Sequence, residues 1–263
     1  MTGQISDFME KYLEGRKLLV GYWVLGYPDF STSIKIMEQI GRHGADIVEI
    51  GFPYSDPVAD GHAIQNASAK ALKNGIDMET LWEAVQQIGR YTSPFLMTYG
   101  NIAFQYGIER FHQKAVENGL QGVIFPDIPP SLYPSRLKEL NPAFIVSPNV
   151  SLERAKMLTK ESRSFVYFLS GLATTGGYQR FDKRLSHILE TVKNVNKDIP
   201  ALVGFGISDI EGVQTALELG FDGVIMGSAL LRTFETNGED AVSKMIDDAR
   251  KTLDDFKKVR AIL

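Results

Sequence analysis

The feature that most constrains the fold is a regular alternation of short apolar runs with longer segments of helical periodicity. Eight runs have the length of a buried strand, at residues 17–24, 46–52, 95–99, 122–126, 143–147, 165–170, 201–204 and 223–226. Helical spacing of apolar residues separates them, for example at 31–43, 78–91, 108–118, 152–161, 181–194 and 210–219. Such an alternation predicts parallel strands joined by helices, and eight of them can close a barrel. We therefore predict an α/β fold, a single (β/α)8 TIM barrel over residues 1–263.

A recurring glycine motif supports repeated βα units. The sequences GAD at 44–46, GLQ at 119–121 and GFD at 220–222 each stop a helical segment and start an apolar run. Two segments fall outside the repeat. Residues 5–13 predict an extra helix before the first strand, and the highly charged residues 239–259 predict an additional C-terminal helical segment.

Composition narrows the class of protein. A chain of 263 residues that is 44% hydrophobic and 23% charged, without low-complexity tracts, fits one globular domain of barrel size. A net charge of −4 argues against a surface for nucleic acid or anionic lipid, and the longest apolar run, 18–27, is too short to span a membrane. The chain has no cysteine and begins with a charged segment rather than a signal sequence, so we expect a cytoplasmic protein.

Two acids lie in the segment 48–66, VEIGFPYSDPVADGHAIQN. Glu49 sits inside an apolar strand, and Asp60 lies in the Pro- and Gly-rich loop that follows. A buried carboxylate requires a partner or a raised pKa, so Glu49 is a candidate for acid-base chemistry or for a satisfied strand-end network. Asp60 is a candidate for the same site or a simple turn residue.

Glycines after the last two predicted strands suggest a phosphate site. Gly204-Phe-Gly206 and Gly227-Ser228 follow strands seven and eight. Glycines let backbone N–H groups approach an anion, and phosphate sites of (β/α)8 barrels often lie at this position, although tight turns have the same composition.

The sequence from 49 to 61, EIGFPYSDPVADG, followed by IQN at 64–66, closely resembles the signature of the tryptophan synthase alpha subunit. Further motifs of that family follow in order: MTYGN at 97–101, PDIP at 126–129, TG at 175–176, GFGI at 204–207 and GS at 227–228. The resemblance covers nearly the whole chain.

The resemblance implies a carbon-carbon lyase that cleaves indole-3-glycerol phosphate to indole and glyceraldehyde 3-phosphate by a retro-aldol reaction without a cofactor or metal. Glu49 then resembles the acid and base, with a pKa raised by its apolar setting. Asp60 resembles the residue that accepts the indole N–H and stays ionised to balance the charge that develops on the nitrogen.

The same resemblance implies roles for residues of the indole pocket, the lid and the phosphate site. The indole pocket is expected to contain Tyr22, Met97, Tyr99, Phe125, Ile145, Tyr167 and Phe205, although core packing also explains aromatic residues in strands. Thr175 resembles the residue that positions the aspartate when a small-residue lid, 170–179, closes. The phosphate is expected at Gly176, Gly206, Gly227 and Ser228.

The family acts with a beta subunit, expected as an α2β2 heterotetramer, which receives the indole and alone holds pyridoxal phosphate. Five positions resemble those that face this partner: Pro53, Asp56, Pro57, Asp127 and Pro129. The sequence departs from the family pattern at Tyr27, at His62 and at residues 171–173. We expect these differences to affect the movement of the loops and the coupling to the partner more than the reaction itself.

Three alternatives remain open at this stage. The chain could be a free-standing lyase that releases indole, or a non-catalytic alpha-like activator of a beta subunit. It could also be an isomerase or epimerase of sugar phosphates, which would not need this aromatic set.

Overall fold

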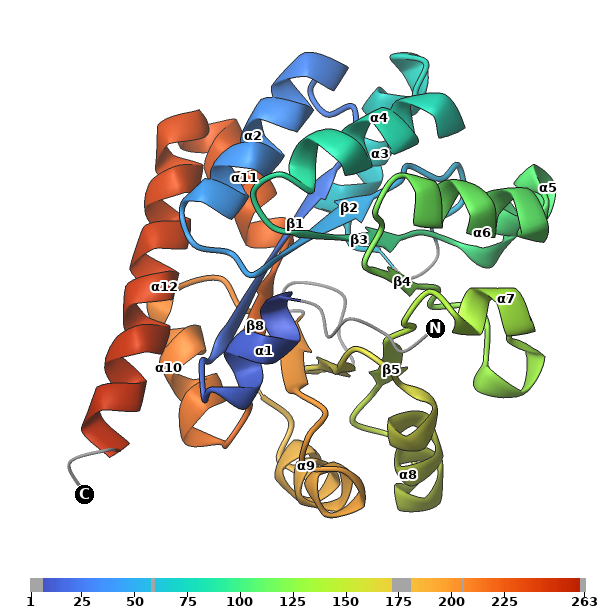
Figure 1. The fold of residues 1–263 in the computed structure, drawn as a ribbon. Coiled ribbons are helices and arrows are strands. Elements are labelled where there is room, and N and C mark those ends of the chain that lie inside the picture. The colour runs from blue at the N-terminus through green and yellow to red at the C-terminus, as the bar shows by residue number, and fades with distance from the viewer. Residues whose placement is uncertain (1–6, 58–59, 172–180, 205, 261–263) are drawn as a thin grey trace.

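The computed structural model describes residues 7–57, 60–171, 181–204 and 206–260, and it has the predicted barrel (Figure 1). All strand pairs are parallel, in the order β4-β3-β2-β1-β8-β7-β6-β5. An isolated bridge from Val123 to Pro142 nearly closes the ring between β4 and β5. The strands are β1 (Leu18–Val24), β2 (Ile47–Gly51), β3 (Ser93–Met97), β4 (Gly122–Ile124), β5 (Phe144–Val146), β6 (Val166–Leu169), β7 (Ala201–Gly204) and β8 (Gly223–Met226).

Helices surround the strands, as the periodicity predicts (Figure 1). They are α2 (Phe30–Arg42), α3 (His62–Lys73), α4 (Met78–Ile88), α5 (Gly100–Tyr106), α6 (Ile108–Glu117), η1 (Pro130–Leu132), α7 (Ser135–Lys138), α8 (Leu152–Glu161), α9 (Arg184–Val195), α10 (Ile210–Glu218) and α11 (Ser228–Asn237). The predicted additions are present as α1 (Asp7–Leu13) and α12 (Glu239–Arg260), and α12 lies along α10, α11 and α2. No helix in the described part of the chain is long and apolar enough to cross a membrane.

Side-chain caps fix where several outer helices begin. Asp29, Ser151 and Asp209 each accept a hydrogen bond from a backbone N–H of the first turn, at 2.9 to 3.3 Å. Asp77 and Thr80 form a reciprocal capping box at the start of α4. Each cap satisfies donors that the helix itself leaves unpaired, so the loops that precede these helices have defined ends.

Aromatic rings link the N-terminal helix to the interior of the barrel. Phe8 of α1 packs edge-on against Phe95 at a centroid distance of 5.6 Å. Phe95 lies 5.5 Å from Phe165, which lies 6.4 Å from Tyr167. This series of contacts runs from α1 through β3 to Tyr167 in β6, and so fills the interior of the barrel with aromatic rings.

Two buried acids, Asp46 and Asp222, tie strands together at the opposite end. Asp46 accepts the N–H of Leu19 at 2.9 Å and pairs with Arg16 at 2.7 Å and with Arg250 of α12 at 3.2 Å. Asp222 accepts the N–H of Ala201 at 3.0 Å and pairs with Lys193 of α9 at 2.9 Å. Both acids belong to the repeated glycine motif, so that motif maintains the fold at the barrel's N-terminal face.

Candidate active site

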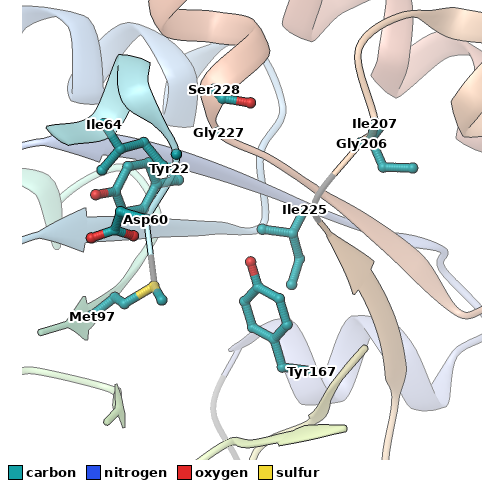
Figure 2. Close-up of a pocket in the computed structure, with 11 residues that line it drawn as sticks. Tyr22, Asp60, Ile64, Met97, Tyr167, Gly206, Ile207, Ile225, Gly227 and Ser228 are labelled. Atoms are coloured by element: carbon teal, nitrogen blue, oxygen red, sulfur yellow. The ribbon is translucent and has the colours of Figure 1, made fainter. Parts of the chain in front are cut away.

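A pocket opens at the C-terminal ends of the strands, where a (β/α)8 barrel places its active site (Figure 2). It draws on β1, β3, β6, β8 and the loops after β2, β7 and β8. Its lining residues are Tyr22, Asp60, Gly61, Ile64, Met97, Tyr167, Gly206, Ile207, Ile225, Gly227 and Ser228. A smaller pocket shares Tyr22, Asp60 and Met97 and adds Phe52, Tyr54, Ser68, Thr98, Tyr99 and Pro126.

Glu49 is a fully buried acid that lines neither pocket but interacts electrostatically with Asp60, which lines both. It lies in β2 between Tyr22 of β1 and Phe95 of β3 and has no exposed surface. Neither carboxylate oxygen has a hydrogen-bond partner among the described residues. Burial, and after it the negative charge of Asp60, raises the pKa of Glu49 to about 8. The side chain is therefore mainly protonated at neutral pH and can donate a proton.

Asp60 has a different environment, although burial also raises its pKa, to about 6. A hydrogen bond from Tyr99 acts in the opposite direction; its hydroxyl lies 3.5 Å from Oδ2, and Tyr54 stacks on the Tyr99 ring at 4.7 Å. Gln65 of α3 donates to the backbone oxygen of Asp60 at 2.8 Å and holds the loop in place. At neutral pH Asp60 is mostly ionised while Glu49 is mostly protonated, which separates a proton donor from an anion.

The far side of the pocket is suited to an anion. Gly206 has a φ of +100°, a conformation that glycine adopts easily. Gly227 is the N-cap of α11 and Ser228 its first residue, so the positive end of the helix dipole points toward the pocket. Gly176, the fourth predicted phosphate residue, lies outside the described residues.

Comparisons with known proteins agree with this geometry. Residues 8–260 match the family model described as Tryptophan synthase alpha chain. The tryptophan synthase alpha chain of Christiangramia forsetii is 35% identical over 261 residues, covering 96% of this chain and 98% of that protein. The one from Methanosarcina mazei is 36% identical over 255 residues, covering 94% and 92%.

Solved structures give the same result. Tryptophan synthase from Mycobacterium tuberculosis, in space group F222, superposes with a TM-score of 0.84 at 30% identity, covering 94% of this chain and 96% of that chain. The chain belongs to the tryptophan synthase alpha chain family. The family predicted from the motifs is confirmed, and with it a lyase of tryptophan biosynthesis that cleaves indole-3-glycerol phosphate. The (β/α)8 barrel is confirmed as well.

The structure brings most of the predicted alpha-chain pocket together. Tyr22, Met97 and Tyr167 line the main pocket, and Tyr99 lines the smaller one. Ile145 pairs with Tyr167 in the register of β5 and β6, but it lines neither pocket. Phe205 and Thr175 lie outside the described residues.

Phe125 lines neither pocket, although the resemblance to the family predicts it in the indole pocket. Its ring packs against Phe111 of α6 at 6.1 Å and against Tyr133 at 6.0 Å, on the helix side of the strand. The next residue, Pro126, lines the smaller pocket instead. Successive residues of an extended chain point to opposite faces, so an assignment that is off by one residue selects the wrong side.

Several residues that line the main pocket could not be predicted from the sequence. Ile64 and Ile207 belong to the IQN and GFGI motifs but are ordinary apolar residues, and Ile225 lies in an apolar strand, so their residue types do not indicate a site. Two glycines that end strands, Gly51 and Gly204, shape the pocket without lining it. A β-carbon on Gly51 would collide with the hydroxyl of Tyr22, and one on Gly204 would lie 2.7 Å from the hydroxyl of Tyr167. These glycines leave room for the two tyrosines.

The predicted partner-facing positions divide into two groups. Asp56 and Asp127 are exposed, and Pro57 and Pro129 are half-buried. Pro53 is buried within the chain, so it does not present a surface to a partner as the chain stands. Asp127 also accepts the N–H of Gly100 at 2.9 Å, which joins the loop after β4 to the start of α5.

Two departures from the family pattern have clear environments. The Tyr27 hydroxyl donates to Glu235 of α11 at 2.8 Å, and its ring contacts Phe234, so the loop after β1 is attached to the helix that begins at Ser228. His62 is exposed at the first position of α3. Of the third departure only Gly171 is described.

Proposed function

We propose that Glu49 and Asp60 carry out the retro-aldol cleavage of indole-3-glycerol phosphate in the pocket of Figure 2. The observation that carries the proposal is the pair of acids with different pKa values, about 8 and about 6, at the C-terminal end of the barrel. Retro-aldol cleavage of this substrate needs a proton donor and a stable anion at the same pH, and the pair provides both.

Glu49 supplies the proton steps. Its carboxylic acid donates a proton to the indole ring carbon that carries the glycerol phosphate, and this gives an indolenine with positive charge at nitrogen. The resulting Glu49 carboxylate then accepts the proton of the side-chain hydroxyl next to the ring. As the aldehyde forms, the carbon-carbon bond breaks and its electron pair returns to the indole. Neither carboxylate oxygen of Glu49 is hydrogen-bonded to a described residue, so the acid has no hydrogen bond to a described residue to give up when it acts on the substrate.

Asp60 balances the charge at the other end of the indole. As a carboxylate it accepts the ring N–H and stabilises the positive charge that develops there when the ring carbon is protonated. Tyr99 supports this role because its hydroxyl donates to Oδ2 of Asp60. A neutral residue could accept the same hydrogen bond but could not balance the charge.

The remaining residues bind and orient the substrate. The rings and side chains of Tyr22, Met97, Tyr99 and Tyr167 provide flat apolar surface for the indole, to which we add Ile145 and Phe205. Gly206, Gly227 and Ser228, together with Gly176, bind the phosphate through backbone N–H groups. Thr175 positions Asp60 when the segment 170–179 closes.

The product indole passes to a beta subunit, which the family implies as a partner. We propose an α2β2 complex in the cytoplasm, with pyridoxal phosphate held only by the beta subunit. Asp56, Pro57, Asp127 and Pro129 face that partner, which is consistent with the exposure of the two aspartates and the partial exposure of the two prolines in the loops after β2 and β4.

A direct assay tests this function. The purified chain is mixed with indole-3-glycerol phosphate, with and without a beta subunit, and both indole and glyceraldehyde 3-phosphate are measured. We expect the two products in equal amounts and a higher rate with the beta subunit. Full activity without any response to a beta subunit would indicate a free-standing lyase. Absence of both products under all conditions would reject the proposal.

A further inference from the structure

The hydroxyl of Tyr22 has no part in the function proposed so far. A flat ring is sufficient to contact indole, and the groups that affect Tyr22, among them Asp60 and Glu49, act on it through their charges rather than through a hydrogen bond. The side chain is nevertheless 7% exposed and lines both pockets, so its hydroxyl is placed in a largely desolvated site. A ligand that fills the pocket would remove water from this hydroxyl, and a hydroxyl that loses water without gaining a protein partner is unfavourable.

The surrounding glycines define where this hydroxyl lies. At the base of the side chain, a β-carbon on Gly227 would be 3.3 Å from Cβ of Tyr22. At its tip, a β-carbon on Gly51 would collide with the hydroxyl oxygen. The ring therefore reaches from the phosphate end of the pocket to the end of β2. In Figure 2 the hydroxyl of Tyr22 and the carboxylate of Asp60 lie on the same side of the pocket, and the two groups interact electrostatically.

Four ionisable side chains surround or adjoin Asp60 in this region: Glu49 on β2, Tyr22 on β1, Tyr99 after β3 and Tyr167 on β6. Tyr99 reaches Oδ2 at 3.5 Å, which is long for a hydrogen bond between a hydroxyl and a carboxylate. Hydrogen bonds of a catalytic site often shorten only when the substrate is bound.

Tyr22 is able to act as a donor throughout the working range of pH. Burial, followed by the charges of Asp60 and Glu49, raises its pKa well above the ordinary value of 10. It therefore keeps its proton when Asp60 is ionised. An O–H group that cannot ionise, next to a carboxylate that must remain ionised, favours a hydrogen bond from the first to the second.

We propose that the Tyr22 hydroxyl donates a hydrogen bond to the Asp60 carboxylate when the pocket is occupied. Tyr22 is then a positioning residue, which keeps Asp60 ionised and aimed at the indole nitrogen. This inference rests on the function proposed for Asp60, and it extends that function to a residue whose ring alone was assigned to the indole pocket.

The test is the variant Tyr22→Phe, which removes only the oxygen. The pKa of Asp60 is measured by carbon NMR of its carboxyl group in the presence of indole and glycerol 3-phosphate. Loss of a donor to the carboxylate must raise this pKa, by roughly half a unit or more. Tyr99→Phe should change it in the same direction. Tyr133→Phe is the matched control, because it removes a buried tyrosine hydroxyl that packs among Phe125 and Phe144, outside both pockets.

Activity provides a second readout. In Tyr22→Phe, kcat/KM for indole-3-glycerol phosphate should fall roughly 10-fold, as for loss of one hydrogen bond to a charged group, while glycerol 3-phosphate binds unchanged. An Asp60 pKa that stays the same or falls in Tyr22→Phe overturns the inference, whatever the rate. Because the NMR titration needs no turnover, it also separates this inference from the proposed lyase function, which would fail if the unmodified chain did not cleave the substrate.

Discussion

Tyr22 on β1 lies opposite Glu49 on β2 in the parallel register, and Phe95 on β3 flanks Glu49 on the other side. The acid therefore stands between two aromatic side chains in a strand that is buried along its whole length. This setting withdraws the carboxyl from water without giving it a hydrogen-bond partner among the described residues. The physical consequence is a proton held at neutral pH, on which the proposed reaction depends.

The first prediction concerns the rate. Glu49→Gln retains the shape of the side chain but cannot exchange a proton, so turnover should fall by roughly 10²-fold or more while glycerol 3-phosphate still binds. Glu83→Gln, which changes an exposed glutamate of α4, is the control and should have normal activity. Turnover of Glu49→Gln within a few-fold of the unmodified chain would contradict the assignment.

The second prediction concerns stability. Glu49 has a folded pKa of about 8, above its ordinary value of 4.5, so its contribution to stability is complete below pH 4.5 and is lost as pH rises through 8. Glu49→Gln has no such loss. The variant should become more stable than the unmodified chain with rising pH, by a few kcal/mol at pH 9, since each pKa unit corresponds to about 1.4 kcal/mol.

Urea unfolding at pH 5 and pH 9 measures this difference. Asp60→Asn is a useful comparison, because the pH range over which Asp60 changes the stability is lower. This range lies between the ordinary pKa of 3.8 and the folded pKa of about 6. If the stability difference between Glu49→Gln and the unmodified chain is the same at both pH values, Glu49 does not have a raised pKa.

The third prediction concerns the glycine that accommodates Tyr22. Gly51→Ala places a methyl group against the hydroxyl and ring of Tyr22, so the tyrosine must move. We expect a loss of roughly 1 to 3 kcal/mol of stability, as for an overpacked core, together with reduced activity. Gly212→Ala in α10 meets ordinary contacts at 3.6 to 3.9 Å and should cost nothing. Equal behaviour of the two variants would show that Tyr22 is not fixed by Gly51.

The fourth prediction concerns the phosphate. Gly206→Val introduces a β-branched residue where φ is +100° and fills space at the anion end of the pocket, so the affinity for glycerol 3-phosphate should fall at least ~10-fold. Ser228→Ala should lose only a few-fold, because its backbone N–H remains. Calorimetry measures both, and an unchanged Kd for Gly206→Val would place the phosphate elsewhere.

Much of the fold could be predicted from sequence because its buried strands are continuous apolar runs between glycines and helical segments. Helix α3 was less evident, since its buried face consists of Ile64, Ala67, Ser68 and Ala71 and lacks a stripe of large apolar residues. The closing of the ring between β4 and β5 depends on a single bridge, which no local pattern encodes.

Glu49 could be predicted as a site residue because a carboxylate in an apolar strand is unfavourable without a partner or a function. The side of the barrel to which Phe125 points was not, because the one-residue register at a strand end decides it. Ile207 follows β7 and Ile225 lies in β8, and they meet Tyr22 in the pocket because β8 pairs with β1. The hydrogen bond from Tyr27 to Glu235 likewise joins residues that are 208 positions apart.

The measurement that tests the central claim most directly is the pH dependence of kcat/KM for cleavage of indole-3-glycerol phosphate. The active form of the free enzyme has Asp60 ionised and Glu49 protonated, so the profile should be bell-shaped, rising near pH 6 and falling near pH 8. Because the two acids interact, these limbs belong to the pair. A rate that rises with pH to a plateau, without a decline near pH 8, would contradict the account, because Glu49 would then be active without its proton.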